Sequence, residues 1–319
     1  MGLSVTQVSP GAATMMLRSS PWLDLGAAMD SLILGEVALS TAVLTGAPAG
    51  TDVRTASLSV TLFRAASLDA NLIAHARTLT SAPRFTFAEV AIEDDRGRAV
   101  ARVTGAALVQ PRDPPPPAAP PLGPVDEPTY STPDPPLRPL SAGVQGVPVD
   151  YWERFDGMTV VQKLAGPEAP PLFRMLGLGD GDVDEGQYKG ATLPATEWFC
   201  YHGREIAPGV MAVAMYIAAT GASHTLSGVG FRPGALNMSY SFLRPVVPDG
   251  RTLVIGGRAT EQHEDLVLAS ATVTDGEGRR LATLHETALI LPVGSGRSQR
   301  PSRCWPPSCS PTSSIPPLG

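Results

Sequence analysis

The chain has 319 residues, of which 43% are hydrophobic and 17% are charged, a balance typical of a folded protein with a buried core. Its net charge of −6 argues against nucleic acid as the main partner, and its three cysteines form no disulfide framework. The length predicts about two domains. The N-terminus lacks a basic region followed by an apolar run, so we expect no signal peptide and a cytoplasmic location.

The first half of the chain reads as one apolar helix followed by several strands. Residues 27–44, "AAMDSLILGEVALSTAVL", carry almost no charge, and a helix that is apolar nearly all round must be buried. The alternation in "TASLSVTLF" then puts Leu58, Val60 and Leu62 on one face of a half-buried strand. A strand in "NLIAHARTL" and a strand–turn–strand unit over 85–109 follow. A sheet is therefore expected to wrap the helix.

Two segments read as non-globular. Residues 111–149 are so rich in proline that neither a helix nor a central strand can persist there, which predicts a semi-rigid linker. Residues 294–319 lack hydrophobic periodicity and are predicted to form a disordered tail. The expected organisation is a first domain over 1–110, the linker, a second domain with an N-terminal lead-in over 150–293, and the tail.

The second half repeats the first at an offset of 180 residues. "TLFRAASLDA" at 61–70 is matched by "SFLRPVVPDG" at 241–250, so Arg64 corresponds to Arg244. The inward face of the strand keeps its register, with an apolar residue at each of Met238, Tyr240 and Phe242. The apolar run "GVMAVAMYIAATGA" corresponds to the first helix and is too short to span a membrane. We conclude that one fold is present twice.

This layout resembles the hotdog fold, and it is similar to the tandem acyl-CoA thioesterases related to phenylacetyl-CoA thioesterase. The stretches that carry the resemblance are "GEVALSTAV", "APGVMAVAM" and "FLRPVVPDG", and it covers residues 1–110 and about 172–292. It implies an α+β protein with two hotdog folds in one chain, each an antiparallel sheet wrapped around a long central helix. The usual His-Gly-Gly turn before the helix is missing here.

The resemblance places Glu36 at the family's carboxylate position and Tyr216 at the equivalent position of the second half. Glu36 is the only acid between Ser31 and Asp52, and an unpaired charge in an apolar helix is costly. Such a carboxylate could be a nucleophile or a general base, with a pKa raised by desolvation. Ser40 lies one turn along the same face. In the alternative interpretations Glu36 faces solvent or an arginine, and Asp30 is either the catalytic acid or a helix cap.

The second half keeps the turn "YHGREIAPGV" before its helix. Gly209 follows Pro208 at the predicted first turn, where backbone N–H groups have no partner within the helix. Such a helix start suits a thioester oxygen that develops negative charge. The expected site is therefore single and composite, with the acid from Glu36 and the oxyanion donor near Gly209.

Several other residues are candidates for binding the substrate. Arg64, Arg244 and Arg204 could hold the phosphates of CoA, or they could be ordinary exposed charges. Tyr216 fills core space or lines the acyl pocket, and His202 lies in the active-site turn. The remaining histidines show no metal-ligand spacing, so neither a metal nor another cofactor is expected.

Three functions follow from these patterns. The leading one is hydrolysis of a fatty or aromatic acyl-CoA thioester, with acyl-CoA as the small-molecule partner and a homodimer as a compatible assembly. The second is a non-catalytic protein that binds acyl-CoA or lipid. The third is a hotdog hydratase or dehydratase, which needs a His–acid pair that the "MAVAMYIAA" helix does not supply.

Overall fold

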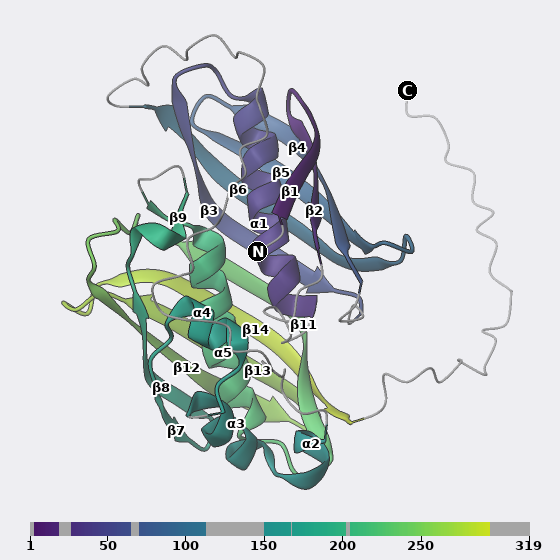
Figure 1. Cartoon of the computed structure of the whole chain (residues 1–319), viewed down its shortest axis with the longest axis vertical. Helices are drawn as coiled ribbons and strands as arrows, with labels where there is room; N and C mark the ends of the chain where they lie inside the picture. Colours follow the sequence, from purple (N-terminus) through teal and green to yellow (C-terminus); the bar gives the residue numbers. More distant parts are fainter. Residues whose placement is uncertain are drawn as a thin grey trace, which may run out of the picture.

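The computed structural model describes residues 3–18, 27–64, 70–112, 150–166, 168–201 and 205–293. Figure 1 shows two long helices, each lying against its own part of one large sheet. His202 and Arg204 lie outside the described residues, as do almost all of the predicted linker and the predicted tail.

One antiparallel sheet of twelve strands runs through the molecule, in the order β1-β2-β4-β5-β6-β3-β11-β14-β13-β12-β8-β7. The strands of the first half are β1 (Leu3–Ser9), β2 (Ala12–Leu17), β3 (Thr51–Leu62), β4 (Leu72–Ala82), β5 (Phe85–Asp94) and β6 (Ala99–Pro111). Those of the second half are β7 (Asp182–Asp184), β8 (Gln187–Pro194), β11 (Phe231–Phe242), β12 (Thr252–His263), β13 (Leu266–Thr274) and β14 (Arg280–Pro292). A separate short pair consists of β9 (Cys200–Tyr201) and β10 (Glu205–Ile206).

The two halves meet where β3 pairs with β11. Ser59 lies opposite Ser239, and the side chain of Asn237 donates to Thr61 Oγ1 at 3.2 Å. These polar side chains share one face of the sheet, while the buried Leu58 and Tyr240 share the other. Because this pairing joins the two sets of strands, the halves form one continuous sheet.

The long helices are α1 (Ala27–Gly46) and α5 (Pro208–His224). Helix α1 packs on β2, β4 and β5, whereas α5 packs on β12, β13 and β14, and the two helices also contact each other. Among the described residues, Ala28–Gly46 is the one helical stretch long and apolar enough to cross a membrane. Because 67% of that stretch is buried inside the protein, its composition is explained by its place in the core.

The two halves contain turns with the same hydrogen-bond pattern. In the β5–β6 turn, the carboxylate of Asp94 accepts from the N–H groups of Arg96 and Arg98 at 3.0 Å, and the Arg98 side chain pairs with it. In the β13–β14 turn, Asp275 is bonded in the same way by the N–H groups of Glu277 and Arg279. Each turn then needs a left-handed residue, which glycine supplies without strain.

The second half also carries short helices that precede its sheet: α2 (Tyr151–Arg154), α3 (Gly157–Ala165), α4 (Pro171–Leu176) and the 3₁₀ turn η2 (Glu197–Phe199). Helix α3 begins at an N-cap, since Asp156 accepts from the N–H of Thr159 at 2.8 Å. At Gly157 this helix crosses the end of α5 so closely that a Cβ would lie 1.7 Å from the carbonyl oxygen of His224. Helix α3 packs against α5, and α5 is buried almost continuously from Gly209 to Ser223.

Candidate active site

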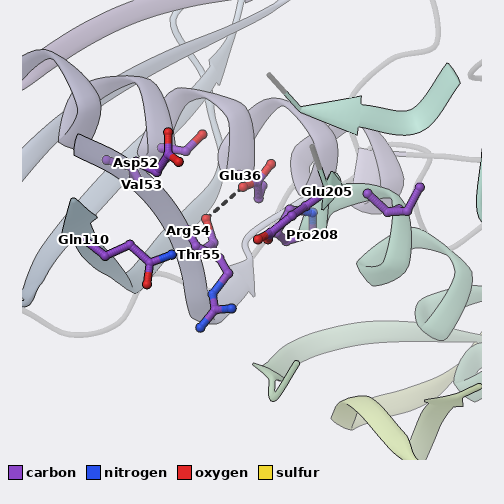
Figure 2. A pocket seen from close by; sticks show the side chains of 10 residues that line it. Glu36, Asp52, Val53, Arg54, Thr55, Gln110, Glu205 and Pro208 are labelled. Atoms are coloured by element: carbon purple, nitrogen blue, oxygen red, sulfur yellow. Dashed lines mark hydrogen bonds between the residues drawn. The ribbon is translucent and has the colours of Figure 1, made fainter. Parts of the chain in front are cut away.

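A carboxyl group is buried where the two long helices meet. Glu36 lies in the middle of α1 with only 1% of its surface exposed. The hydroxyl of Thr55, at the start of β3, donates to its Oε1 at 2.8 Å (Figure 2). No ion pair to Glu36 is formed by any residue that the structure describes. Glu36 is therefore hydrogen-bonded to a neutral hydroxyl and is not paired with a cation.

The start of α5 faces this acid from the other half. A Cβ on Gly209 would lie 3.4 Å from Glu36 Oε2 and 3.5 Å from Glu36 Cβ, so the backbone of α5 approaches the carboxyl group closely. The N–H of Gly209 favours the ionised carboxylate, although Oε2 has no hydrogen bond of ordinary geometry within the described part of the chain. The positive end of the helix dipole is thus aimed at the acid.

Burial is the main influence on the proton affinity of Glu36. It raises the pKa of the carboxyl group to about 7, and the Thr55 hydroxyl and the Gly209 N–H only partly oppose the rise. An acid with a pKa near neutrality is present in both protonation states at physiological pH. This is the condition under which a carboxyl group accepts and returns a proton most effectively.

A small pocket of ≈ 60 Å³ opens beside Glu36. This is room for a few water molecules. Asp52 of the pocket wall pairs with Arg112, with Oδ1 and Nε 3.6 Å apart. Burial raises the pKa of the Glu205 carboxyl group, and the nearby Arg54 guanidinium partly opposes the rise. Figure 2 shows both halves contributing to the wall. The lining residues are Glu36, Ser40, Asp52, Val53, Arg54, Thr55, Gln110, Glu205, Ile206 and Pro208.

The other predicted residues fall in different places. Ser40 is buried, lines the pocket and donates to the carbonyl of Val37 at 3.1 Å. Asp30 lies in the first turn of α1 and is not part of the pocket wall. Arg64 and Arg244 are exposed at strand ends, away from the pocket lining.

Tyr216 is also separate from this pocket. It is nine-tenths buried on α5, within the core cluster that both helices share. It therefore does not lie beside Glu36. Among the described residues, no group of three His, Cys, Asp or Glu side chains is arranged to hold a metal ion.

Five polar lining residues had not been expected as parts of the site: Asp52, Arg54, Thr55, Gln110 and Glu205. Thr55 has the same parity as Ser57 and Ser59, so simple alternation puts it on the outer face. A bulge between Thr55 and Ser57 reverses the side-chain direction, and Thr55 is 1% exposed. Thr55 is the first residue of the alternating stretch "TASLSVTLF", and alternation alone does not reveal the bulge.

Comparison with known proteins finds solved structures with a similar fold, but no related curated sequence. No protein-family model matches the chain, and no curated protein matches its sequence. A tesB protein from Mycobacterium avium subspecies paratuberculosis is 13% identical with a TM-score of 0.54, and the match covers 90% of this chain and 96% of that one. Acyl-CoA thioesterase II TesB2 from Mycobacterium marinum is 9% identical with a TM-score of 0.52, covering 91% and 96%.

A protein of unknown function with a hot dog fold from Alicyclobacillus acidocaldarius is also similar. It is 11% identical with a TM-score of 0.54, and the match covers 90% of this chain and 96% of that one. At these identities the likeness concerns the fold alone. This chain has a hotdog fold built on a large antiparallel sheet, and the resemblance predicted from its sequence is confirmed at that level.

Proposed function

We propose that the protein is an acyl-CoA thioesterase made of two hotdog units that share one active site. The observation that carries the proposal is the buried Glu36, held by Thr55 and faced by the start of α5 from the other half. The structural neighbours include a protein described as an acyl-CoA thioesterase, which favours the same chemistry by analogy.

In the proposed reaction, a water molecule in the pocket is activated by the ionised carboxylate of Glu36. The carboxylate takes one proton from the water as the oxygen attacks the thioester carbon, and the carbonyl oxygen becomes negatively charged. The N-terminus of α5 stabilises this oxyanion through its helix dipole and its N–H groups. When the C–S bond breaks, the thiolate of CoA takes the proton back from Glu36, and a carboxylic acid is released. In a variant of this scheme, the Glu36 carboxylate attacks the thioester carbon, the C–S bond breaks and CoA leaves as its thiolate. Water then cleaves the resulting anhydride, which regenerates Glu36 and releases the carboxylic acid.

The pocket residues suit distinct roles in this scheme. Thr55 fixes the orientation of the carboxyl group, and the amide of Gln110 and the hydroxyl of Ser40 provide further polar groups around the water. Arg54 is placed at the wall, where a guanidinium could bind a phosphate of CoA more directly than the outlying Arg64 and Arg244.

The test is release of free CoA from a panel of acyl-CoA thioesters that differ in chain length and aromaticity. Glu36→Gln should reduce kcat by about 100-fold or more, since the amide cannot accept the proton. Asp30→Asn, on the same helix but outside the pocket, is the matched control and should retain activity. Binding without hydrolysis by the unaltered protein would assign it to the acyl-CoA-binding class instead.

A further inference from the structure

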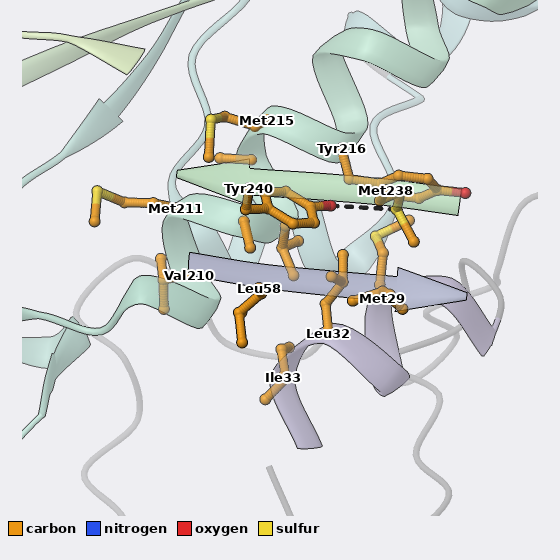
Figure 3. Close-up of a cluster of buried hydrophobic side chains, with 14 of the residues drawn as sticks. Met29, Leu32, Ile33, Leu58, Val210, Met211, Met215, Tyr216, Met238 and Tyr240 are labelled. Atoms are coloured by element: carbon orange, nitrogen blue, oxygen red, sulfur yellow. Dashed lines mark hydrogen bonds between the residues drawn. The ribbon is translucent and has the colours of Figure 1, made fainter. Parts of the chain in front are cut away.

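Four methionines lie in the buried cluster near the contact between the two long helices, and this part of the core is called here the methionine-lined region. Figure 3 shows Met29 on α1, Met211 and Met215 on α5, and Met238 on β11 around one buried region. Each of these side chains is at most 5% exposed. Methionine is unbranched and adaptable, so it can make room for a ligand at little cost.

This region begins at the proposed active site. Ile33 lies one turn before Glu36 on α1, and its Cα would be 3.7 Å from a Cβ on Gly209. On the other side of Glu36, the pocket wall is polar, with Asp52, Arg54 and Glu205. A thioester carbonyl held at Glu36 would therefore direct its CoA portion to the polar side and its acyl chain between the helices.

Buried polar groups lie at the far side of the methionine-lined region. The hydroxyl of Tyr240 donates to Met238 Sδ at 3.2 Å, although a thioether is a weak acceptor. Opposite Met238 on the neighbouring strand is Glu286, which is 3% exposed. Its two oxygens lie 2.9 and 3.2 Å from the single hydroxyl of Thr220. The hydroxyl of Thr220 also faces Tyr216.

Among the described residues, the hydroxyl of Thr220 is the one hydrogen-bond partner found for both carboxyl oxygens of Glu286. One hydroxyl can donate to only one carboxyl oxygen at a time, and within the described residues Glu286 forms no ion pair. Burial raises the pKa of Glu286 to about 8, so the group is mainly a neutral acid at physiological pH. A neutral acid both donates and accepts, and leaving it poorly bonded in a core is costly.

We propose that Tyr216, Thr220, Tyr240 and Glu286 form a subsite for an uncharged oxygen, a hydroxyl or a keto group, on the acyl chain of the substrate. The inference rests on the proposed thioesterase function. The ligand oxygen is uncharged because the groups around it are hydroxyls, a neutral acid and methionines. Along α5, Tyr216 and Thr220 lie seven and eleven residues beyond Gly209, or about 10 to 16 Å. The oxygen is therefore in the distal part of a medium-length chain.

The experiment compares pairs of medium-chain acyl-CoAs that differ only in a distal hydroxyl or keto group. The unaltered protein should hydrolyse the oxygenated member with a kcat/KM about tenfold higher, the size of one or two net hydrogen bonds. In Glu286→Leu and in Tyr240→Phe this ratio should fall towards one. The second variant removes only a hydroxyl, so it keeps the test valid if the first does not fold.

Tyr188→Phe is the matched control. Tyr188 is a buried tyrosine on β8 whose ring packs on the opposite side of α5, where a Cβ on Gly221 would lie 3.4 Å from its Cδ2. The ratio should not change in this variant. A ratio near one in the unaltered protein, or an unchanged ratio in both Tyr240→Phe and Glu286→Leu, would overturn the subsite.

Failure of the subsite can be separated from failure of the thioesterase proposal. If the unaltered protein releases no CoA from any thioester, the same comparison is made by calorimetry with non-hydrolysable thioether analogues. A preference of about tenfold in Kd for the oxygenated analogue, lost in Tyr240→Phe, would support the subsite in a binding protein. Equal affinities for the two analogues would overturn it.

Discussion

The two halves of the molecule each bury one acid against one hydroxyl, but in opposite arrangements. In the first half the acid, Glu36, is on the helix and the hydroxyl of Thr55 is on a strand. In the second half the hydroxyl of Thr220 is on the helix and the acid, Glu286, is on a strand. The first pair opens to a pocket, whereas the second is enclosed by the core.

The residues at matching positions of the two halves also differ. In the pseudo-equivalent position of the second half, Tyr216 replaces the acid, and Met29 stands on α1 where Gly209 stands on α5. A glycine lets the helix start approach a carboxyl group, and a methionine there fills the space with apolar atoms. Under the proposed function, the site at Glu36 supplies the chemistry and its counterpart at Tyr216 receives the acyl chain.

The largest loss of activity should follow from adding a side chain at Gly209, because this would disturb the polar site that distinguishes the two halves. A Cβ would already lie 3.4 Å from Glu36 Oε2, so the branches of Gly209→Val must displace the acid or the helix start. We expect kcat/KM of Gly209→Val to fall roughly 100-fold, and kcat/KM of Gly209→Ala to lie between those of Gly209→Val and the unaltered protein. Gly228→Ala, where a Cβ meets nothing within 4 Å, is the control. Full activity of the valine variant would exclude this close approach from the mechanism.

The next effect concerns the hydroxyl that orients the acid. Thr55→Val removes the 2.8 Å hydrogen bond to Glu36 but keeps the shape of the side chain. Because this bond lowers the pKa of Glu36, its loss should raise that pKa further and reduce kcat about tenfold at neutral pH. Thr61→Val, on the outer face of the same strand, should have no such effect. Equal behaviour of the two variants would contradict a role for Thr55.

The ionisation of Glu286 in the second half should change the stability of the fold rather than the rate of hydrolysis. The pKa of Glu286 is about 8 in the folded protein, above its ordinary value of 4.5. The stabilisation linked to its proton is therefore complete below pH 4.5 and is lost as the pH rises through 8. Glu286→Gln should weaken this loss. The loss is measured as the difference in the free energy of unfolding between pH 4.5 and pH 8, by denaturant unfolding of the variant and of the unaltered protein. An identical loss in both proteins would contradict the raised pKa of Glu286.

The smallest effect should come from Tyr216→Phe. Its hydroxyl faces Thr220 away from the pocket of Glu36, so its loss affects the fit of the acyl chain more than the chemical step. We expect KM to rise roughly threefold with little change in kcat, which corresponds to loss of a weak hydrogen bond. Steady-state kinetics on an oxygenated acyl-CoA would show the split. A large fall in kcat with an unchanged KM would place Tyr216 at the reacting atoms instead.

The elements of this fold could be predicted from the sequence because they follow from local patterns. The predominantly apolar helices, the register shared by Leu58 and Met238 and the aspartate turns all have periodic or short-range signals. The same holds for Glu36, a lone acid in an apolar helix, and for Gly209, a glycine beside a proline at a helix start.

The rest of the site depends on features that these signals do not contain. Thr55 turns inwards because of a bulge, which a strict alternation cannot anticipate. Glu286 did have a signal, since it shares the inward parity of Leu284 and Ala288 on β14, but only the fold shows that Thr220 meets it. Gly209 and Glu36 are 173 positions apart in the chain (209 − 36), so their closeness depends on how the two helices pack together.

The most direct test of the central claim is the pH dependence of kcat/KM for thioester hydrolysis. With Glu36 as the base and a pKa of about 7, the rate should rise through neutrality and level off above it. The midpoint should move to higher pH in Thr55→Val, and the residual rate of Glu36→Gln should show no such rise. A rise centred near neutrality that persists in Glu36→Gln would contradict the role of Glu36 as the base. Another group would then accept the proton, and His202 would be the first to test.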